Sequence, residues 1–533
     1  MKPKYFFLGL FVLSFTHVHG QLRAVKEWSA VYDGPAHGVD LPLASILDKN
    51  RNFYITGRSV GDSSGMDIAT IKYSPSGQQT LTLRYNSPAN SWDEGNSLAV
   101  DDSGNIYVAG TSAVTSSGWE IVLLKYSPTG SICWESHFRP DTANSATASK
   151  IVLDTLGNIY LGGTCKSQML LLKYNRAGLL LDSAMIGDDS TMHAVSDLLI
   201  TRSGSICLAG SRSYILPGND VPTVECAVVS VDTEGRLLWK EYLKAESARS
   251  VCLDRQGNIV VIAGGNGTTA KYSPDGHLRW NRDHQNSSPW IEILTGLAID
   301  NRNRIIVGGY GCVVGCFDYM TLWYDADGNI VHYQSYNSPD TLRDFCMALT
   351  LDKSDNVYLT GMSAAGYSDG TCLTLKYDSS AIKIWEKTYS SSPSAIDEGE
   401  FIAVDDSGYV YVGGSSVTLN GWDYLAIKYS QVVGVEVRDE TVGSNPSIFS
   451  LSQNYPNPFN PITNITFQVP ITSHVTLSVY DMLGREVAVL VNERREAGVH
   501  EVKFDGSGLS SGVYFYRLTA GTFVETRRLL LLR

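Results

Sequence analysis

The stretch Leu98-Ala-Val-Asp-Asp-Ser-Gly-Asn-Ile-Tyr-Val-Ala-Gly110 decides the fold of this 533-residue chain. A very similar stretch, Ile402-Ala-Val-Asp-Asp-Ser-Gly-Tyr-Val-Tyr-Val-Gly-Gly414, stands about 300 residues later. Between Leu43 and Ser430 the pattern occurs eight times as an apolar run, an Asp, a Gly/Asn turn and a β-branched or aromatic run that ends in Gly. A repeat of about 50 residues predicts a closed or stacked array of small structural units.

Each unit reads as four short strands. In the second unit the first three are Leu98–Val100, Ile106–Ala109 and Ile121–Tyr126, and the fourth carries an aromatic pattern such as Trp239-Lys-Glu-Tyr242. No segment keeps a 3.6-residue apolar period between capping residues, so we expect few helices. The units align on one position, which is Asp48, Asp101, Asp154, Thr201, Asp254, Asp300, Asp352 and Asp405.

The turns between these strands have recognisable chemistry. In the first turn of unit two, Asp102 or Ser103 can accept a hydrogen bond from its own backbone, and Gly104 supplies the left-handed conformation of a tight hairpin. In the Ser-Pro-x-Gly turn between the third and fourth strands, Pro75 presets one dihedral and Gly77 supplies a positive φ. Both turns favour antiparallel meanders.

Four-stranded units repeated around an axis are the blades of a β-propeller. The eighth unit ends at Lys428-Tyr-Ser430 without a fourth strand, whereas Trp28–Tyr32 is an orphan strand of that type before unit one. We therefore predict an all-β, eight-bladed propeller over 21–430, closed by its N-terminal strand, which removes both free edges. Seven blades are the alternative, because units four and five are irregular and unit six lacks a Trp.

The units resemble the β-propeller repeats of exported bacterial proteins. The resemblance rests on Asp-x-x-Gly-Asn-Ile-Tyr-Val-x-Gly followed by Lys-Tyr-Ser-x-x-Gly, and it covers about 400 residues. It implies a fold and almost no defined activity.

The N-terminus has the pattern of a secretory signal peptide. Lys2 and Lys4 precede the apolar run Phe6–Phe15, and small residues follow near position 20. We predict that residues 1–20 are removed and that the mature chain begins at Gln21. No later stretch approaches the ~18 apolar residues of a membrane-spanning helix.

Charge and cysteine content exclude several classes of function. The net charge is -13, and removing Lys2 and Lys4 leaves -15, so a nucleic-acid partner is not expected. Cys207 and Cys252 fall inside strand patterns as small hydrophobes. Cys312 and Cys316 flank a short loop and could form a disulfide, which the sequence leaves open. No cysteine spacing fits zinc.

The composition changes after Ser430. We predict a polar linker at 431–447 and a second domain at 448–533. Its alternating stretches predict about six strands, which suggests a small Ig-like β-sandwich. These stretches are 465–469, 475–480, 487–491, 499–504, 513–516 and 523–531.

This domain resembles the type A C-terminal sorting domain of the type IX secretion system. The motifs are Tyr455-Pro-Asn-Pro-Phe-Asn-Pro461, Val479-Tyr-Asp-Met-Leu-Gly-Arg485, Ser511-Gly-Val-Tyr-Phe-Tyr-Arg517 and the tail Thr526–Arg533. The resemblance implies export through the periplasm by the type IX machinery, removal of the domain, and release or attachment at the outer cell surface. The residues that carry this signal are Pro456, Asn457, Pro458, Phe459, Gly484, Gly512, Tyr514 and Arg517.

Two loops near the expected propeller axis repeat an acidic pattern. These are Trp92-Asp-Glu-Gly95 and Ile396-Asp-Glu-Gly399-Glu400. Asp93, Glu94, Asp397 and Glu398 are candidate ligand-binding residues, and three interpretations stay open. They are solvated turn residues, ligands of a hard cation such as Ca²⁺, or an acid–base pair. We assign no catalytic residue and no metal ligand, and we expect no cofactor other than this Ca²⁺.

Aromatic residues precede carboxylates in another set of loops. Trp119, Phe317 and Trp422 could surround a mouth and stack on sugars, although the recurrence of the pattern favours a structural role. There the acid would bond to backbone amides at the start of a strand. The Asp of each first turn lacks the alternating spacing of a calcium loop, so we interpret it as turn chemistry.

No nucleophile elbow of the G-x-S-x-G type stands on an expected strand-to-helix turn, and no phosphate loop or H-E-x-x-H motif occurs. We therefore expect a monomeric, secreted or surface-attached binding or scaffold module rather than an enzyme, with a polysaccharide or protein ligand. The alternative is a glycan- or lactone-active hydrolase or lyase with its site at the propeller mouth.

Overall fold

The computed structural model divides the chain into two units, residues 1–435 and 436–533, which are described separately. The predicted signal peptide and most of the predicted linker lie outside the described residues. The structure describes residues 21–434 and 449–531 except 116–117, 140–144, 188–190, 219–220, 266, 285–292, 313–316, 339–342, 367–369, 419–420, 455–456, 458 and 522.

The described part of the first unit consists of strands and turns, as predicted. The strands closest to the axis are β2 (Asp40–Leu47), β6 (Asp93–Val100), β10 (Ala146–Leu153), β14 (Met192–Ile200), β18 (Ala248–Leu253), β22 (Ile293–Ile299), β26 (Arg343–Leu351) and β30 (Ile396–Val404). Next outward lie β3 (Phe53–Val60), β7 (Ile106–Thr115), β11 (Ile159–Cys165), β15 (Ile206–Tyr214), β19 (Ile259–Ala263), β23 (Ile305–Cys312), β27 (Val357–Ala364) and β31 (Val410–Thr418).

Two further strands complete each group. The third strands are β4 (Met66–Tyr73), β8 (Gly118–Tyr126), β12 (Gln168–Tyr174), β16 (Thr223–Val231), β20 (Thr268–Tyr272), β24 (Phe317–Tyr324), β28 (Thr371–Tyr377) and β32 (Gly421–Gly434). The outer strands are β5 (Gln79–Tyr85), β9 (Ile132–Phe138), β13 (Leu180–Ile186), β17 (Leu237–Leu243), β21 (Leu278–Arg282), β25 (Ile330–Tyr336), β29 (Lys383–Tyr389) and β1 (Gln21–Tyr32).

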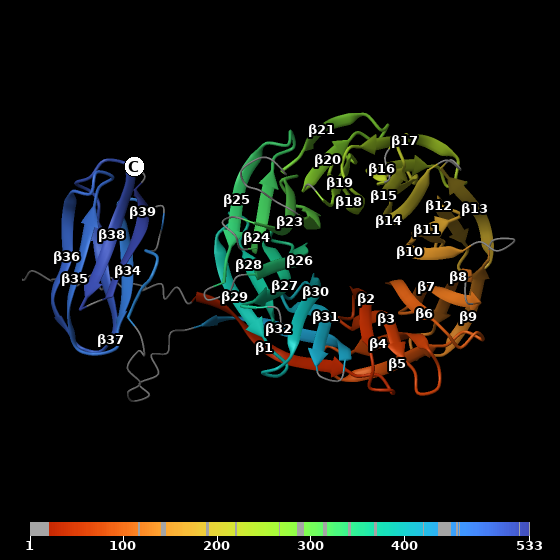
Figure 1. Ribbon diagram of the computed structural model, residues 1–533, viewed down its shortest axis with the longest axis horizontal. Helices are drawn as coiled ribbons and strands as arrows, with labels where there is room; N and C mark the ends of the chain where they lie inside the picture. Colours follow the sequence, from red (N-terminus) through yellow and green to blue (C-terminus); the bar gives the residue numbers. More distant parts are fainter. Residues whose placement is uncertain are drawn as a thin grey trace, which may run out of the picture. The chain divides into compact units, whose positions relative to one another are not determined.

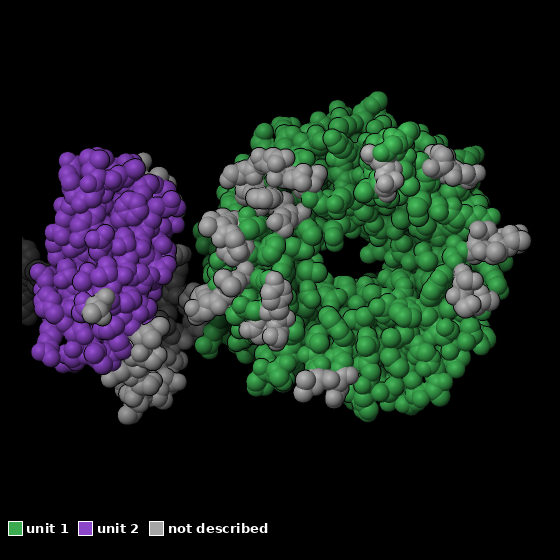
Figure 2. Space-filling model, viewed as in Figure 1, with its two compact units in different colours: residues 1–435 green, residues 436–533 purple. Residues whose placement is uncertain are grey.

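The strands pair antiparallel within each group and form a ring (Figure 1). Six groups are separate four-stranded sheets. β22–β25 and β26–β29 join into one eight-stranded sheet through a single parallel bridge between Phe317 and Arg343. The space-filling view shows an opening through the middle of this unit (Figure 2).

The ring closes through the N-terminal strand. β1 pairs antiparallel with β32, from Gln21 opposite Gly434 to Tyr32 opposite Tyr424, so the orphan strand lies where the sequence predicted it. This pairing corrects the predicted start of the linker. Residues 431–434 belong to β32, because β1 begins at Gln21, before Trp28, and its residues 21–24 pair with them.

The first turn of seven of the eight repeats is held by the aligned Asp itself, rather than by a residue at the position of Asp102 or Ser103, and Thr201 stands at this position in the fourth repeat. Asp101 Oδ1 accepts the backbone N–H groups of Ser103 and Asn105, both at 2.9 Å, and Oδ2 accepts from the Asn105 side chain and from Tyr107. These hydrogen bonds lower the pKa of Asp101 against the effect of burial. Both carboxylate oxygens therefore serve this turn, and Arg176 of the next group of strands lies 3.9 Å from Oδ2.

The core lies between neighbouring sheets. Tyr107 and Leu123 of one sheet pack against Leu161 and Leu172 of the next, all nearly fully buried. The two middle strands of each group are covered on both faces, which is why their sequences read as continuous apolar runs. The eight cysteines among the described residues, including Cys207 and Cys312, form no disulfide with one another, and burial raises the pKa of the Cys207 thiol. Cys316 lies outside the described residues.

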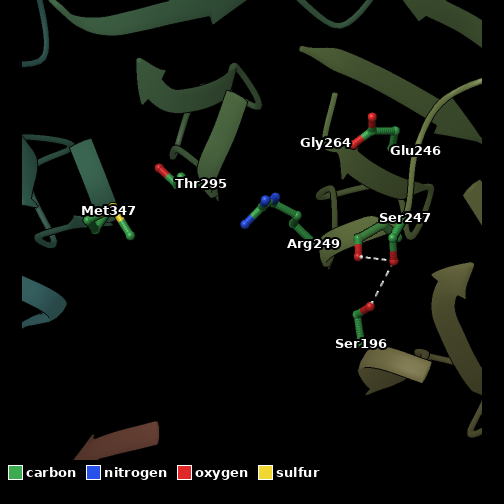
Figure 3. A pocket seen from close by; sticks show the side chains of 8 residues that line it. Ser196, Glu246, Ser247, Arg249, Gly264, Thr295 and Met347 are labelled. Carbon is green, nitrogen blue, oxygen red and sulfur yellow. Dashed lines mark hydrogen bonds between the residues drawn. The ribbon is translucent and has the colours of Figure 1, made fainter. Parts of the chain in front are cut away.

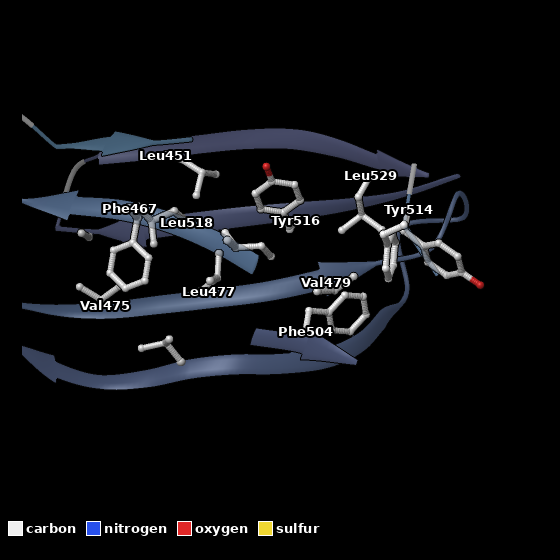
Figure 4. Close-up of a cluster of buried hydrophobic side chains, with 14 of the residues drawn as sticks. Leu451, Phe467, Val475, Leu477, Val479, Phe504, Tyr514, Tyr516, Leu518 and Leu529 are labelled. Carbon is white, nitrogen blue, oxygen red and sulfur yellow. The ribbon is translucent and has the colours of Figure 1, made fainter. Parts of the chain in front are cut away.

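The second unit is built from two sheets that share one core. β33 (Ser450–Leu451), β34 (Ile462–Val469) and β37 (Gly498–Asp505) form one sheet. β36 (Glu486–Arg495), β35 (Ser473–Tyr480), β38 (Gly512–Ala520) and β39 (Phe523–Leu531) form the other. Figure 4 shows Phe467, Leu477, Val479, Tyr516 and Leu518 converging between them.

The predicted sorting residues hold the ends of this unit together. Asn457 Oδ1 accepts the N–H of Leu530 at 2.8 Å, and the buried Phe459 donates its N–H to the carbonyl of Leu530 at 2.9 Å. Gly484 adopts a positive φ of 76° in the β35–β36 turn. Gly512, Tyr514 and Arg517 lie on β38, and Pro456 and Pro458 fall outside the described residues. Across the described residues, no helix could cross a membrane.

Candidate functional site

Every strand closest to the axis carries a β-bulge at the same position. In β6, for example, Gly95 and Ser97 pair with consecutive residues of β7, which leaves Asn96 as an extra residue. Because a bulge redirects a side chain and is frequent beside functional sites, this ring of eight residues is the first candidate for a binding surface. The bulged residues are Leu43, Asn96, Ser149, Ser196, Arg249, Thr295, Met347 and Glu400.

In seven of the eight repeats a glycine of the second strand pairs with the residue before the bulge, and Ala263 takes this place in β19. A Cβ on Gly57, Gly210 or Gly414 would lie 1.9 Å from a carbonyl oxygen of the neighbouring inner strand. No side chain fits at that distance, so these close approaches of two backbones require glycine. The recurring Gly of the sequence motif accompanies the bulge, although the bulge of β18 forms opposite Ala263.

Four of the bulged residues line one cavity beside the axis. Ser196, Arg249, Thr295 and Met347, from β14, β18, β22 and β26, lie around a volume of about 380 Å³. Its size is within the range of small-molecule sites. The other lining residues are Glu246, Ser247, Ala248 and Gly264.

Figure 3 shows the guanidinium of Arg249 pointing into this axial pocket. Arg249 is exposed and makes no hydrogen bond or ion pair with any described residue. The hydroxyls nearby are engaged: Ser196 and Ser247 lie 3.2 Å apart, and Thr295 donates to the carbonyl of Cys346 at 2.9 Å. The pocket thus offers one unpaired cation beside hydroxyl groups.

The two residues of each predicted acidic pair, Asp93 with Glu94 and Asp397 with Glu398, have different environments. Asp93 and Asp397 are fully buried, so they are not solvated turn residues. Each accepts a backbone N–H from six residues earlier in its own loop, Ser87 to Asp93 at 2.7 Å and Ser391 to Asp397 at 2.6 Å. Burial raises the pKa of Asp93. Both carboxylates organise the loop that leads into the inner strand.

The two glutamates of these pairs have different surroundings. Glu94 forms an ion pair with Arg58 at 2.9 Å, and Arg58 stacks on Trp92. Next to Glu398, Met362 takes the place that Arg58 has next to Glu94. Met362 follows Gly361 in β27 as Arg58 follows Gly57 in β3. Glu398 has no ion pair among the described residues, and burial raises its pKa.

Glu400, the bulged residue two positions after Glu398, extends this acidic site. The Ser415 hydroxyl donates to Glu400 Oε1. Burial, with a smaller contribution from the Glu398 carboxylate, raises the pKa of Glu400 to about 7. Glu398 and Glu400 thus form a pair of carboxyl groups with raised pKa values in the last group of strands.

The predicted aromatic residues do not surround the axis. Trp119, Phe317 and Trp422 lie at or next to the start of third strands, two strand spacings, or about 10 Å, away from the inner strand of their own sheet. Phe317 packs against Phe345 with ring centroids 5.2 Å apart, and Trp422 is 39% exposed. They lie along the face of the ring, apart from the axial pocket.

The carboxylates beside these aromatics do not share one role. Glu120, which follows Trp119, lies 2.9 Å from His137 of the outer strand of its own sheet. Asp423, which follows Trp422, makes no hydrogen bond or ion pair with a described residue. In the first group of strands the equivalent Asp67 follows Met66 and accepts from Arg84 at 2.8 Å. The expected cap on backbone amides is therefore not a common feature of these carboxylates.

Two family models match parts of this chain. Residues 453–531 match the model of the secretion system C-terminal sorting domain, and residues 89–116 match the β-propeller repeat. The chain carries a β-propeller repeat and a type IX secretion C-terminal sorting domain. It is exported and is either secreted or located at the cell surface. No sequence among the curated proteins matches it.

Solved structures with a similar fold include the Dos1 propeller, with 10% identity, coverage of 78% of this chain and 96% of that one, and a TM-score of 0.48. An ulvan lyase of a polysaccharide lyase family has 13% identity, coverage of 68% and 95%, and a TM-score of 0.41. Virginiamycin B lyase from Staphylococcus aureus has 11% identity, coverage of 62% and 93%, and a TM-score of 0.39.

Proposed function

We propose that this protein is a secreted or surface-attached binding module whose ligand enters the axial pocket of an eight-bladed propeller. The blade count is supported by the pairing of 32 strands into groups of four, with β1 completing the last group. The two-sheet second unit supports a small Ig-like sandwich that the type IX machinery recognises. The signal peptide, and removal of the sorting domain after transport, belong to the same proposal.

The unpaired guanidinium of Arg249 is the observation that carries this function. It points into a cavity lined by Ser196, Ser247 and Thr295, so it would pair with an anionic group while the hydroxyls bind neighbouring oxygens. We infer an acidic polysaccharide as the ligand class, bound through a carboxylate- or sulfate-bearing sugar. Glu246, which also lines the pocket, would accept hydrogen bonds from sugar hydroxyls.

The experiment is a binding measurement with the chain that lacks only the predicted signal peptide, residues 21–533. Immobilised acidic and neutral envelope polysaccharides are probed with the parent protein, with Arg249→Ala and with the control Arg279→Ala. Arg279 is exposed on β21, the outer strand of the sheet that carries Arg249. We expect at least a tenfold loss for Arg249→Ala, because a charge-assisted contact contributes about 1.5–3 kcal/mol. Equal binding by all three proteins, or none by the parent, would overturn the proposal.

A hydrolase remains the second candidate because of Glu398 and Glu400. A carboxyl group whose pKa lies near 7 can act as a general acid or base at neutral pH, and Glu400 meets that condition. On this hypothesis Glu400 transfers the proton and Glu398 is the ionised partner. A polysaccharide that is cleaved by the parent and not by Glu400→Gln would favour it, whereas binding without turnover favours the binding module.

A further inference from the structure

Three carboxylates meet where the ring closes, away from the axial pocket. Asp33 directly follows β1, Asp40 opens β2, and Asp423 lies near the start of β32. One carboxylate oxygen from each side chain lies within 4.8 Å of the other two. This closure cluster therefore joins the N-terminal strand, the first inner strand and the last sheet.

Two of the three carboxylates are buried without adequate partners. Asp40 is fully buried: Oδ2 accepts the N–H of Gly34 at 2.5 Å, while Oδ1 has no partner of good geometry. Asp423 is 6% exposed and makes no hydrogen bond or ion pair with a described residue. Burying a carboxylate is unfavourable unless a cation or hydrogen-bond donors compensate it.

The cations nearby are already engaged. His37 contacts Asp33 at 2.7 Å on the exposed side of the cluster. Arg84 donates to Asp67 at 2.8 Å and also to Ser59 and Tyr32, not to the cluster. Burial and the charges of Asp33 and Asp40 raise the pKa of Asp423 to about 6.

The first two sheets, β2–β5 and β6–β9, meet at an equivalent boundary, here called the first seam, where the carboxylates have a positively charged partner. There Asp67 and Asp93 correspond to Asp423 and Asp40, and the outer-strand residue Arg84 neutralises Asp67. The register places Val31 of β1 at the position of Arg84, since Tyr32 pairs with Tyr424 as Tyr85 pairs with Ile68.

The next position of the same alignment differs as well. Asp33 follows Tyr32 where Asn86 follows Tyr85. At these two positions the boundary between the last and the first sheet, the closing seam, has Val31 in place of the positive Arg84 and the negative Asp33 in place of Asn86. Both changes concentrate negative charge at one point.

We propose that Asp33, Asp40 and Asp423 bind a divalent cation, Ca²⁺, which fastens the N-terminal strand to the last sheet. The donor set is made of carboxylate oxygens, as a hard cation requires. Oxygens bound to one Ca²⁺ at about 2.3–2.6 Å lie no more than about 5 Å apart, which the cluster satisfies. Water molecules would complete the coordination shell of the ion on the side of Asp33, whose side chain is 36% exposed.

The site would be weak and suited to the cell exterior. Three protein ligands, one of them exposed, predict a dissociation constant in the range of about 10⁻⁴–10⁻³ M that extracellular modules show. A bound ion stabilises the folded ring by mass action, so closure would depend on the calcium concentration outside the cell.

The test measures calcium binding by calorimetry and thermal unfolding of residues 21–533 in EDTA and in 10 mM Ca²⁺, at constant ionic strength. We expect saturable binding and an increase of several degrees in the unfolding temperature. Asp33→Asn and Asp423→Asn should each weaken binding at least tenfold and abolish the increase. Asp318→Asn is the matched control, because Asp318 precedes Tyr319 in β24 as Asp423 precedes Tyr424 in β32.

A misfolded variant would be recognised by its stability in EDTA. Without the ion, Asp423→Asn removes charge repulsion, so it should unfold at the same temperature as the parent or higher. If Asp423→Asn fails to fold, Asp33→Asn decides the question, since its side chain is at the surface. The proposal is wrong if the parent shows no calcium-dependent increase, or if Asp33→Asn keeps the whole increase.

Discussion

The indole Nε1 of Trp28 donates a hydrogen bond to the carbonyl of Pro75, at 3.1 Å and 47 residues away. Trp28 belongs to the outer strand of the last sheet, and Pro75 to the turn between β4 and β5 of the first. The same bond recurs between Trp239 and Pro274 at 3.0 Å. An outer-strand Trp thus fixes one sheet to the turn of the next, and Trp28 does so across the closure.

Trp28→Ala should therefore open the ring at its closure. The change removes the hydrogen bond and the packing of the indole against Tyr73, whose ring centroid lies 5.8 Å away. We expect a loss of about 2–4 kcal/mol in the free energy of unfolding. Urea unfolding measures it, and Trp422→Ala, which removes an exposed indole, should cost less than about 1 kcal/mol. Equal losses in the two variants would show that Trp28 has no special role.

Gly77→Ala tests the turn that receives this indole. A Cβ at Gly77 would lie 2.5 Å from Cγ of Trp28, and the φ of Gly77 is +86°. Gly204 has the same φ with nothing within 4 Å of its Cβ. Gly204→Ala should cost only the backbone penalty, about 1 kcal/mol, and Gly77→Ala at least about 2 kcal/mol more. Similar unfolding free energies would place the requirement for glycine in the backbone alone.

The sequence predicts the ring because its signals are local and repeated. Three signals predict it: the turn residues, the apolar middle strands and the orphan strand Trp28–Tyr32. Each depends only on a turn or on the pairing of two strands, and the structure agrees with all three. The sequence predicts turn chemistry for the Asp of each first turn, but it does not separate Asp101 from Asp102 and Ser103, since all three are good candidates by residue type. Only the geometry shows which carboxylate meets the backbone amides.

The candidate sites are less predictable because they depend on register and on contacts distant in sequence. A bulge shifts one residue toward the axis, so Arg249 and Glu400 reach their positions through strand pairing rather than through a motif. The recurring glycine of the second strands is visible in the sequence, but only the structure shows that a Cβ there would lie 1.9 Å from a carbonyl oxygen. Asp40 and Asp423 are 383 positions apart and meet only because the ring closes.

Tyr516→Phe should destabilise the sorting domain without changing the propeller. The Tyr516 hydroxyl donates to the carbonyl of Ser452 at 2.7 Å and accepts the N–H of Asn454 at 2.8 Å. Losing both bonds leaves a buried N–H without a partner, which costs about 1–3 kcal/mol. Because the two units have separate cores, calorimetry should show one transition moved and the other unchanged. Movement of both transitions would contradict this independence.

Glu400→Gln should remove a pH dependence of the propeller's stability. The folded-state pKa of Glu400, about 7, lies above its ordinary value of 4.5. Between these values the folded chain holds a proton that the unfolded chain releases, so stability falls as pH rises from about 4.5 to 7. The variant should match the parent near pH 4.5 and exceed it by about 1–3 kcal/mol at pH 8.

Denaturant unfolding at pH 4.5, 6 and 8 measures this difference, with the exposed Glu241→Gln on β17 as the control that should follow the parent. A substitution of the neighbouring Glu398 gives a second test, because the Glu398 charge contributes to the raised pKa of Glu400. In Glu398→Gln the pKa of Glu400 should therefore fall, and part of the pH dependence should disappear. A Glu400→Gln profile parallel to that of the parent would mean that Glu400 is ionised at neutral pH, and the hydrolase hypothesis would lose its proton donor.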